Sequence, residues 1–97
     1  MSTYISLINY TQDGIAAIKD SPKRLSVVKR LAKKMGGKVK HFYLTLGDYD
    51  LVVVYEMPDA ATAAKFMLTV GSTGAVRSKT LTAFPEAEYR EIIASLP

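Results

Sequence analysis

The segment Leu51-Val52-Val53-Val54-Tyr55 is apolar at every position, and it constrains the fold more than any other part of the chain. Successive side chains of a strand point to opposite faces, so a strand with this sequence puts apolar groups on both sides of its sheet. Strands of this kind lie in the middle of a sheet and are covered on both faces. The segment therefore predicts a central strand from Asp50 to Met57.

Three further segments have strand patterns. Thr3 to Tyr10 alternates and is rich in β-branched and aromatic residues, and Val39 to Leu46 precedes the central strand closely enough to form a hairpin with it. Val76 to Phe84 is more polar, as expected for the edge of a sheet.

Helix patterns separate these strands. Thr11 is placed to cap a short helix, and Ser21 at the cap with Pro22 in the first turn starts a longer one that Gly36-Gly37 ends. Asp59 is placed to cap a helix from Ala60 to Val70, closed by Gly71. A last helix is predicted from Pro85 to Leu96. Its expected buried side consists of Tyr89, Ile92, Ile93 and Leu96.

The resulting order is βαββαβ with an extra C-terminal helix, in a single domain over residues 1–97. This order predicts an α+β, ferredoxin-like antiparallel sheet, with the first and third strands in the middle and both helices on one face. The other face would stay open although the third strand is apolar on both sides. A second copy stacked on that face is the simplest cover, so we expect a homodimer or a multiple of dimers.

Composition excludes several classes of site. The chain has no cysteine and one histidine, His41, so disulfides, thiolate metal sites and all-histidine metal sites are ruled out, and no metal or cofactor is expected. No apolar run approaches the ~20 residues of a membrane span, and the start lacks the features of a signal peptide. We therefore expect a cytoplasmic protein.

Charge is unevenly distributed along the chain. Nine of the thirteen basic residues lie between Lys19 and Lys40, where Asp20 is the one acid. A basic stripe can attract nucleic acid, but here the charges surround an apolar helix stripe, and no base-reading motif accompanies them. The solvated face of a helix is the preferred interpretation.

The turn Gly47-Asp48-Tyr49-Asp50 admits two interpretations. In the structural one, which we favour, glycine supplies an unusual backbone conformation, the aspartates accept backbone N–H groups, and Tyr49 covers the edge of the core or contacts a partner subunit. In the functional one, Asp50 acts as a general base or Tyr49 holds a ligand. No second catalytic group stands nearby in sequence.

A second candidate site centres on His41 and Tyr43, which alternate onto one face of their strand together with Val39 and Thr45. Tyr4 and Tyr10 are assigned to the same site, because they could line that side of the first strand. Histidine and tyrosines could bind a small aromatic molecule, and histidine could move a proton. The alternative is an ordinary histidine at a subunit interface.

Three segments resemble the GYD domain family: "NYTQDGIAAIKDSPKR", "GGKVKHFYLTLGDYDLVVVYEMPD" and "GSTGAVRSKTLTAF". The resemblance covers nearly the whole chain and includes the Gly-x-Tyr-Asp signature at Gly47 to Asp50. It implies a ferredoxin-like fold of the dimeric α/β-barrel type and does not imply an activity. A tryptophan that the resemblance leads us to expect in the second strand is Leu44 here.

Three functions remain open. The first is a non-catalytic oligomeric module that binds a small molecule or a protein. The second is a cofactor-free enzyme, an oxygenase or isomerase acting on a small aromatic compound, by analogy of fold alone. The third, which the charge pattern disfavours, is nucleic-acid binding through the basic helix. A cavity between sheet and helices lined by His41 or tyrosines would favour the second over the first.

Overall fold

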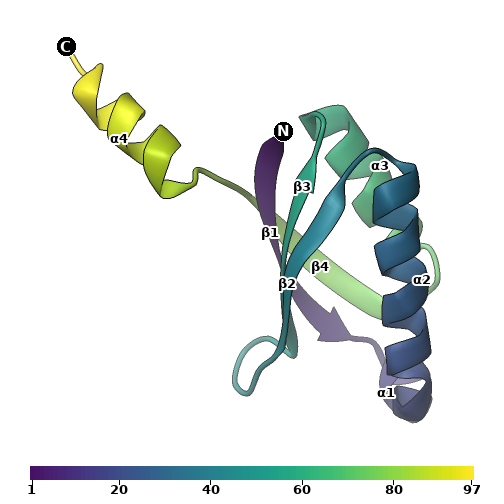
Figure 1. The fold of residues 1–97 in the computed structure, drawn as a ribbon. Coiled ribbons are helices and arrows are strands. Elements are labelled where there is room, and N and C mark those ends of the chain that lie inside the picture. Colours follow the sequence, from purple (N-terminus) through teal and green to yellow (C-terminus); the bar gives the residue numbers. More distant parts are fainter.

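A computed structural model describes residues 1–97 and contains a four-stranded antiparallel sheet with its helices (Figure 1). The elements are β1 (Ser2–Tyr10), α1 (Gln12–Ala16), the 3-10 turn η1 (Ile18–Asp20), α2 (Ser21–Lys34), β2 (Lys38–Leu44), β3 (Leu51–Met57), α3 (Ala60–Gly71), β4 (Val76–Ala83) and α4 (Glu86–Ala94).

The strand order is β2-β3-β1-β4, so the predicted central position of β1 and β3 is confirmed. Figure 1 shows α2 and α3 side by side over one face of the sheet, which is the ferredoxin-like α+β arrangement expected from the element order. We call the face under α2 and α3 the helix face and the opposite one the open face. No helix in the chain is long and apolar enough to cross a membrane.

The core lies between the helix face and the two helices. Tyr55 of β3 is fully buried there, with its ring 5.8 Å from Tyr4 and 5.2 Å from Phe66 of α3 (centroid to centroid). Its hydroxyl lies 3.0 Å from that of Ser6, which in turn lies 3.0 Å from the hydroxyl of Thr80. Burial of a large apolar side chain contributes about 1.5–3 kcal/mol. The buried hydroxyls keep hydrogen bonds, so their desolvation is offset.

The open face carries a second apolar band. Val52 and Val54 of β3 point to this side and are only partly buried, whereas their neighbours Leu51 and Val53 are buried under the helices. The strand is therefore apolar on both faces, as predicted. Cross-strand pairing extends the band over β1 and β4, since Leu7 pairs with Val52, Ile5 with Val54, and Leu81 with Ile5.

Two of the three predicted capping residues, Thr11 and Asp59, cap their helices in the structure. The Thr11 side chain accepts the N–H of Gly14, and the Asp59 side chain accepts the N–H of Thr62. The assignment of Ser21 as the cap of α2 was wrong, because Asp20 holds that position and makes no side-chain capping bond. The Ser21 hydroxyl instead lies 2.7 Å from the hydroxyl of Tyr10.

A bulge in β2 changes which side chains share a face. Val39 pairs with Tyr55, but His41 pairs with Val54, so Lys40 is an extra residue on this strand. Val39 consequently packs against the core, and the prediction that it shares a face with His41 was wrong. The bulge shifts the alternation of side chains by one position, and this shift places His41 on the open face, beside Val54.

The connection between β2 and β3 is longer than predicted. β2 ends at Leu44 and β3 begins at Leu51, so six residues, not three, form the loop. Leu46, which was expected in the strand, is fully exposed. The backbone N–H of Asp50 donates to the carbonyl of Ile8 in β1 at 2.9 Å, which draws this end of the loop toward β1.

The position of α4 differs from expectation. Figure 1 shows that this helix stands away from the sheet at the end of an extended connection and touches neither α2 nor α3. The four side chains predicted to be buried are exposed in the single chain: Tyr89, Ile92, Ile93 and Leu96. The amphipathic pattern was identified correctly, but the chain's own core does not cover the apolar side of this helix.

Candidate functional site

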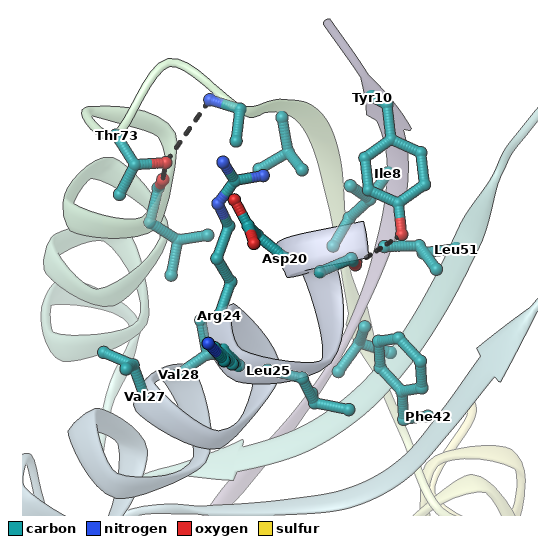
Figure 2. Close-up of a pocket in the computed structure, with 16 residues that line it drawn as sticks. Ile8, Tyr10, Asp20, Arg24, Leu25, Val27, Val28, Phe42, Leu51 and Thr73 are labelled. Carbon is teal, nitrogen blue, oxygen red and sulfur yellow. Dashed lines mark hydrogen bonds between the residues drawn. The ribbon is translucent and has the colours of Figure 1, made fainter. Parts of the chain in front are cut away.

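A cavity of about 320 Å³ lies between α2 and the helix face of the sheet (Figure 2). Sixteen residues line it, and eleven of them are hydrophobic, so most of its wall suits an apolar molecule. Ile8, Phe42 and Val53 come from three adjacent strands, while Leu25 and Val28 come from α2. The cavity is thus a gap in the core packing at the N-terminal end of α2.

Arg24 brings a cation into this apolar surrounding. Its guanidinium nitrogen Nη1 is buried and has no hydrogen-bond partner. The ion pairs of the structure lie elsewhere, between Lys40 and Glu56 and between Arg90 and Glu86. A buried donor left without a partner costs about 1–3 kcal/mol, and more when it is charged.

The position of Arg24 in the sequence explains why part of its side chain is buried. It precedes Val28, Leu31 and Met35 at helical spacing, and those three residues pack against the core. Sequence analysis grouped Arg24 with the solvated basic face of this helix, and for this residue that interpretation was wrong. Arg24 could have been recognised from the sequence, because it is a charged residue at one position of the apolar stripe of this helix.

Other polar groups surround the cavity. The paired hydroxyls of Tyr10 and Ser21 form one side, and Thr73 follows α3 on another. The Thr73 hydroxyl donates to the carbonyl of Val70 at 2.8 Å. Asp20 and Lys23, both exposed, complete the polar part of the lining. Figure 2 shows the Arg24 side chain running from α2 toward Asp20 and the end of α3.

The four residues assigned to a ligand site are divided by the sheet. His41 and Tyr43 lie on the open face with their rings stacked 6.3 Å apart, and Tyr43 is 55% exposed. Tyr4 and Tyr10 lie on the helix face, the first in the core and the second in the cavity wall. The expected common side for all four residues was therefore wrong, because β1 presents its even-numbered side chains to the helices.

The four residues of the turn, Gly47 to Asp50, also have different surroundings in the structure. Gly47 has φ +115°, a value that favours glycine, and its surroundings leave open space where a Cβ would stand. The Asp50 carboxylate accepts the backbone N–H of Tyr10 at 2.9 Å. Asp48 and Tyr49 instead line a shallow polar hollow on the open face, together with Asn9, Arg77 and Lys79.

Two titratable groups have shifted pKa values. Burial raises the pKa of Tyr55 above its usual 10.0, although hydrogen bonds from Ser6 and Thr80 act in the opposite direction. Hydrogen bonds from the Thr62 hydroxyl and N–H lower the pKa of Asp59. Both groups serve the core or a helix cap. No cluster of three or more potential metal ligands is present in residues 1–97.

A protein of known name is similar to this chain in sequence. A Thermus thermophilus protein called "Glutamine synthetase and cystathionine beta-lyase binding protein" is 40% identical over 89 residues, which cover 91% of this chain and 94% of that protein.

Solved structures share the fold at low sequence identity. A feast or famine regulatory protein of M. tuberculosis, in complex with L-methionine, superposes with a TM-score of 0.66 at 15% identity. The match covers 87% of this chain and 50% of the regulator, so the chain spans half the length of that protein. A hypothetical protein of Pyrococcus horikoshii gives a TM-score of 0.56 at 22% identity, with 89% of this chain and 93% of that one covered.

The family assignment rests on nearly the whole chain. The model of the GYD domain matches residues 4–93, which run from β1 into α4 and include the Gly47 to Asp50 signature. The chain belongs to the GYD domain family.

Proposed function

We propose that this chain is a homodimeric binding module of the dimeric α/β-barrel type, whose partner is another protein. The observation that carries the proposal is the apolar band on the open face, which the chain's own helices leave uncovered. Exposed apolar surface costs about 25 cal/mol per Å² relative to burial. Stacking of two open faces would bury the band on both copies at once, with a shared interface of about 1,000 Å² or more.

The exposed side of α4 supports the same assembly. This helix carries Tyr89, Ile92 and Ile93 in the open, at the end of a connection that holds it away from its own sheet. It is also acidic, with Glu86, Glu88 and Glu91, whereas α2 is basic. An arm of this kind can pack on a second copy, which would bury its apolar side and place opposite charges near each other.

A protein partner is supported by the Thermus thermophilus relative, whose name states that it binds glutamine synthetase and cystathionine beta-lyase. We propose a partner of the same class for this chain, an enzyme of amino-acid metabolism. Such a partner would place the chain in the cytoplasm. His41 and Tyr43 lie on the face assigned to dimerisation, so their proposed role is at the interface between copies.

Sedimentation velocity tests the assembly. The wild-type protein is expected to sediment as a dimer or a multiple of dimers at micromolar concentration. Val54→Asp puts a charge in the centre of the open face and should produce monomers. Leu68→Asp is the matched control, because Leu68 of α3 is 74% exposed and points away from that face, and it should leave the assembly unchanged. A compact wild-type monomer would contradict the proposal.

Surface plasmon resonance tests the partner. Glutamine synthetase and cystathionine beta-lyase from the same source organism are immobilised separately, and wild type and Leu68→Asp are passed over each. Saturable binding to at least one enzyme is expected. Absence of binding to both at tens of micromolar would contradict the assignment of partner, while the sedimentation result would stand.

One observation favours a cofactor-free enzyme as a second candidate. On sequence grounds, a cavity between sheet and helices that is lined by His41 or tyrosines is the feature that favours an enzyme. Such a cavity is present and Tyr10 lines it, although His41 lies on the other face. Native mass spectrometry of the purified protein would reveal a bound aromatic compound. An aromatic compound that the protein converts in the absence of cofactor would favour this candidate over the binding module.

A further inference from the structure

We infer that the cavity beneath α2 binds a monocarboxylate with an apolar body of about ten heavy atoms. The inference goes beyond the proposed function, because it concerns the helix face and needs neither the second copy nor the protein partner. It starts from one unexplained feature of the fold, the buried nitrogen Nη1 of Arg24.

The guanidinium group of Arg24 determines which polar group the ligand carries. Arg24 lines the cavity, its Nη1 is buried, and no carboxylate of the chain lies within ion-pair distance of its guanidinium. A planar guanidinium pairs with carboxylates through two parallel hydrogen bonds, and such charge-assisted bonds are stronger than neutral ones. A carboxylate in the cavity would therefore pair with a guanidinium that no acid of the chain pairs with.

The walls and the size of the cavity determine the apolar part of the ligand. The lining away from Arg24 is apolar, with Ile8, Phe42, Leu51 and Val53 on the sheet side. A volume of about 320 Å³ corresponds to about ten water molecules at ~30 Å³ each. A ligand with a medium-length aliphatic chain or one aromatic ring fills this space, whereas acetate would leave most of it empty.

The charges at the cavity limit the ligand to a single negative charge. Lys23 and Arg24 supply two positive charges and Asp20 supplies one negative, so the titratable groups of the lining sum to about one positive charge. A phosphate dianion would exceed this charge. A neutral ligand would leave Nη1 unpaired, and a cation would be repelled by it.

Isothermal titration calorimetry with decanoate tests the inference, at concentrations below micelle formation. Saturable binding is expected at one decanoate per chain. Arg24→Met keeps the length of the side chain and removes its charge, and it should weaken decanoate binding at least tenfold. Decanol should bind this variant at least as tightly as wild type, because the apolar wall is retained. Arg30→Met, on the exposed side of the same helix, should leave decanoate affinity unchanged.

Amide chemical shifts of wild-type protein locate the site without any substitution. Decanoate should shift the signals of Ile8, Thr73 and Val76, which line the cavity, and leave those of Val54 and His41 on the open face in place. No binding at millimolar decanoate would overturn the inference, as would equal weakening by Arg24→Met and Arg30→Met or shifts confined to the open face. None of these results depends on whether the protein is a dimer.

Discussion

The carboxylate of Asp50 accepts the backbone N–H of Tyr10 at 2.9 Å, although 40 positions separate the two residues in sequence. The same loop residue donates its own N–H to the carbonyl of Ile8 and to the side-chain oxygen of Asn9. Asp50 therefore ties the loop between β2 and β3 to the last residues of β1. These bonds support the structural interpretation of this aspartate, because its carboxylate is already engaged by the backbone.

Substitution of Asp50 should test that role. Asp50→Ala leaves the partly buried N–H of Tyr10 without its acceptor and should lower the free energy of unfolding by about 1–3 kcal/mol. Asp50→Asn keeps an oxygen in place and should cost less than about 1 kcal/mol. Asp48→Ala is the control in the same loop, since its side chain is exposed, and it should have almost no effect. Urea unfolding of the three variants measures the differences, and equal stability of Asp48→Ala and Asp50→Ala would contradict the assignment.

Alanine substitutions at Gly47 and Gly71 together test whether the turn needs the backbone conformation of glycine. Both have open space where a Cβ would stand, but only Gly47 has a positive φ, at +115°. Gly47→Ala should therefore destabilise the protein by about 1–2 kcal/mol, through backbone strain alone. Gly71→Ala, at the end of α3, should be neutral or slightly stabilising. Thermal melts of both variants measure the effect, and a Gly47→Ala protein that melts with wild type would disprove a conformational requirement at this turn.

The fold was predictable because its main determinants are local patterns. The two-sided apolar sequence of β3 indicated the middle of the sheet, and the caps at Thr11 and Asp59 indicated helix starts. The bulge at Lys40 was not predictable, since it depends on how β2 aligns with β3 and not on β2 alone. The location of α4 was missed for a related reason. An amphipathic pattern shows that one side of a helix needs cover, but it does not show which surface supplies the cover.

The candidate cavity was less accessible to sequence reasoning than the fold. Its lining combines residues from β1, α2, β2, β3 and the segment after α3, and no short motif connects them. Arg24 was the one residue that the sequence could have identified, since it stands in line with Val28 and Leu31 on an apolar stripe. Tyr4 and Tyr10 were placed on the side of His41 because the alternation of one strand leaves open its orientation relative to the next.

The raised pKa of Tyr55 predicts a pH dependence of stability. Burial raises this pKa above 10.0, so the phenol stays protonated in the folded protein at a pH where the unfolded chain begins to ionise. Its contribution to stability is complete below about pH 10 and is lost as the pH rises through the folded-state pKa. Tyr55→Phe removes the hydroxyl and should be less stable than wild type at pH 8 by about 0.5–1.5 kcal/mol, because the bond to Ser6 is lost.

The difference between wild type and Tyr55→Phe should shrink from about pH 10 upward, at no more than about 1.36 kcal/mol per pH unit. Other tyrosines and lysines titrate in both proteins, so the difference isolates Tyr55. Urea unfolding at several pH values between about 8 and 11 measures it. A difference that stays constant over this range would contradict a raised pKa.

Removal of α4 should affect assembly and spare the chain's own core. Its side chains are exposed in the single chain, so deletion of residues 85–97 takes nothing from the core formed by Tyr55, Phe66 and their neighbours. If α4 packs on a second copy, the deletion should raise the dissociation constant of the dimer at least tenfold, as measured by sedimentation equilibrium. The melting temperature should then fall only at concentrations where wild type is a dimer, because association stabilises the folded state by mass action. The same deletion in Val54→Asp, which is expected to be monomeric, should leave the melting temperature unchanged. A fall in that background would show that α4 packs on its own chain, whereas an unaltered dimer in the truncated wild type would show that the open face alone holds two copies together.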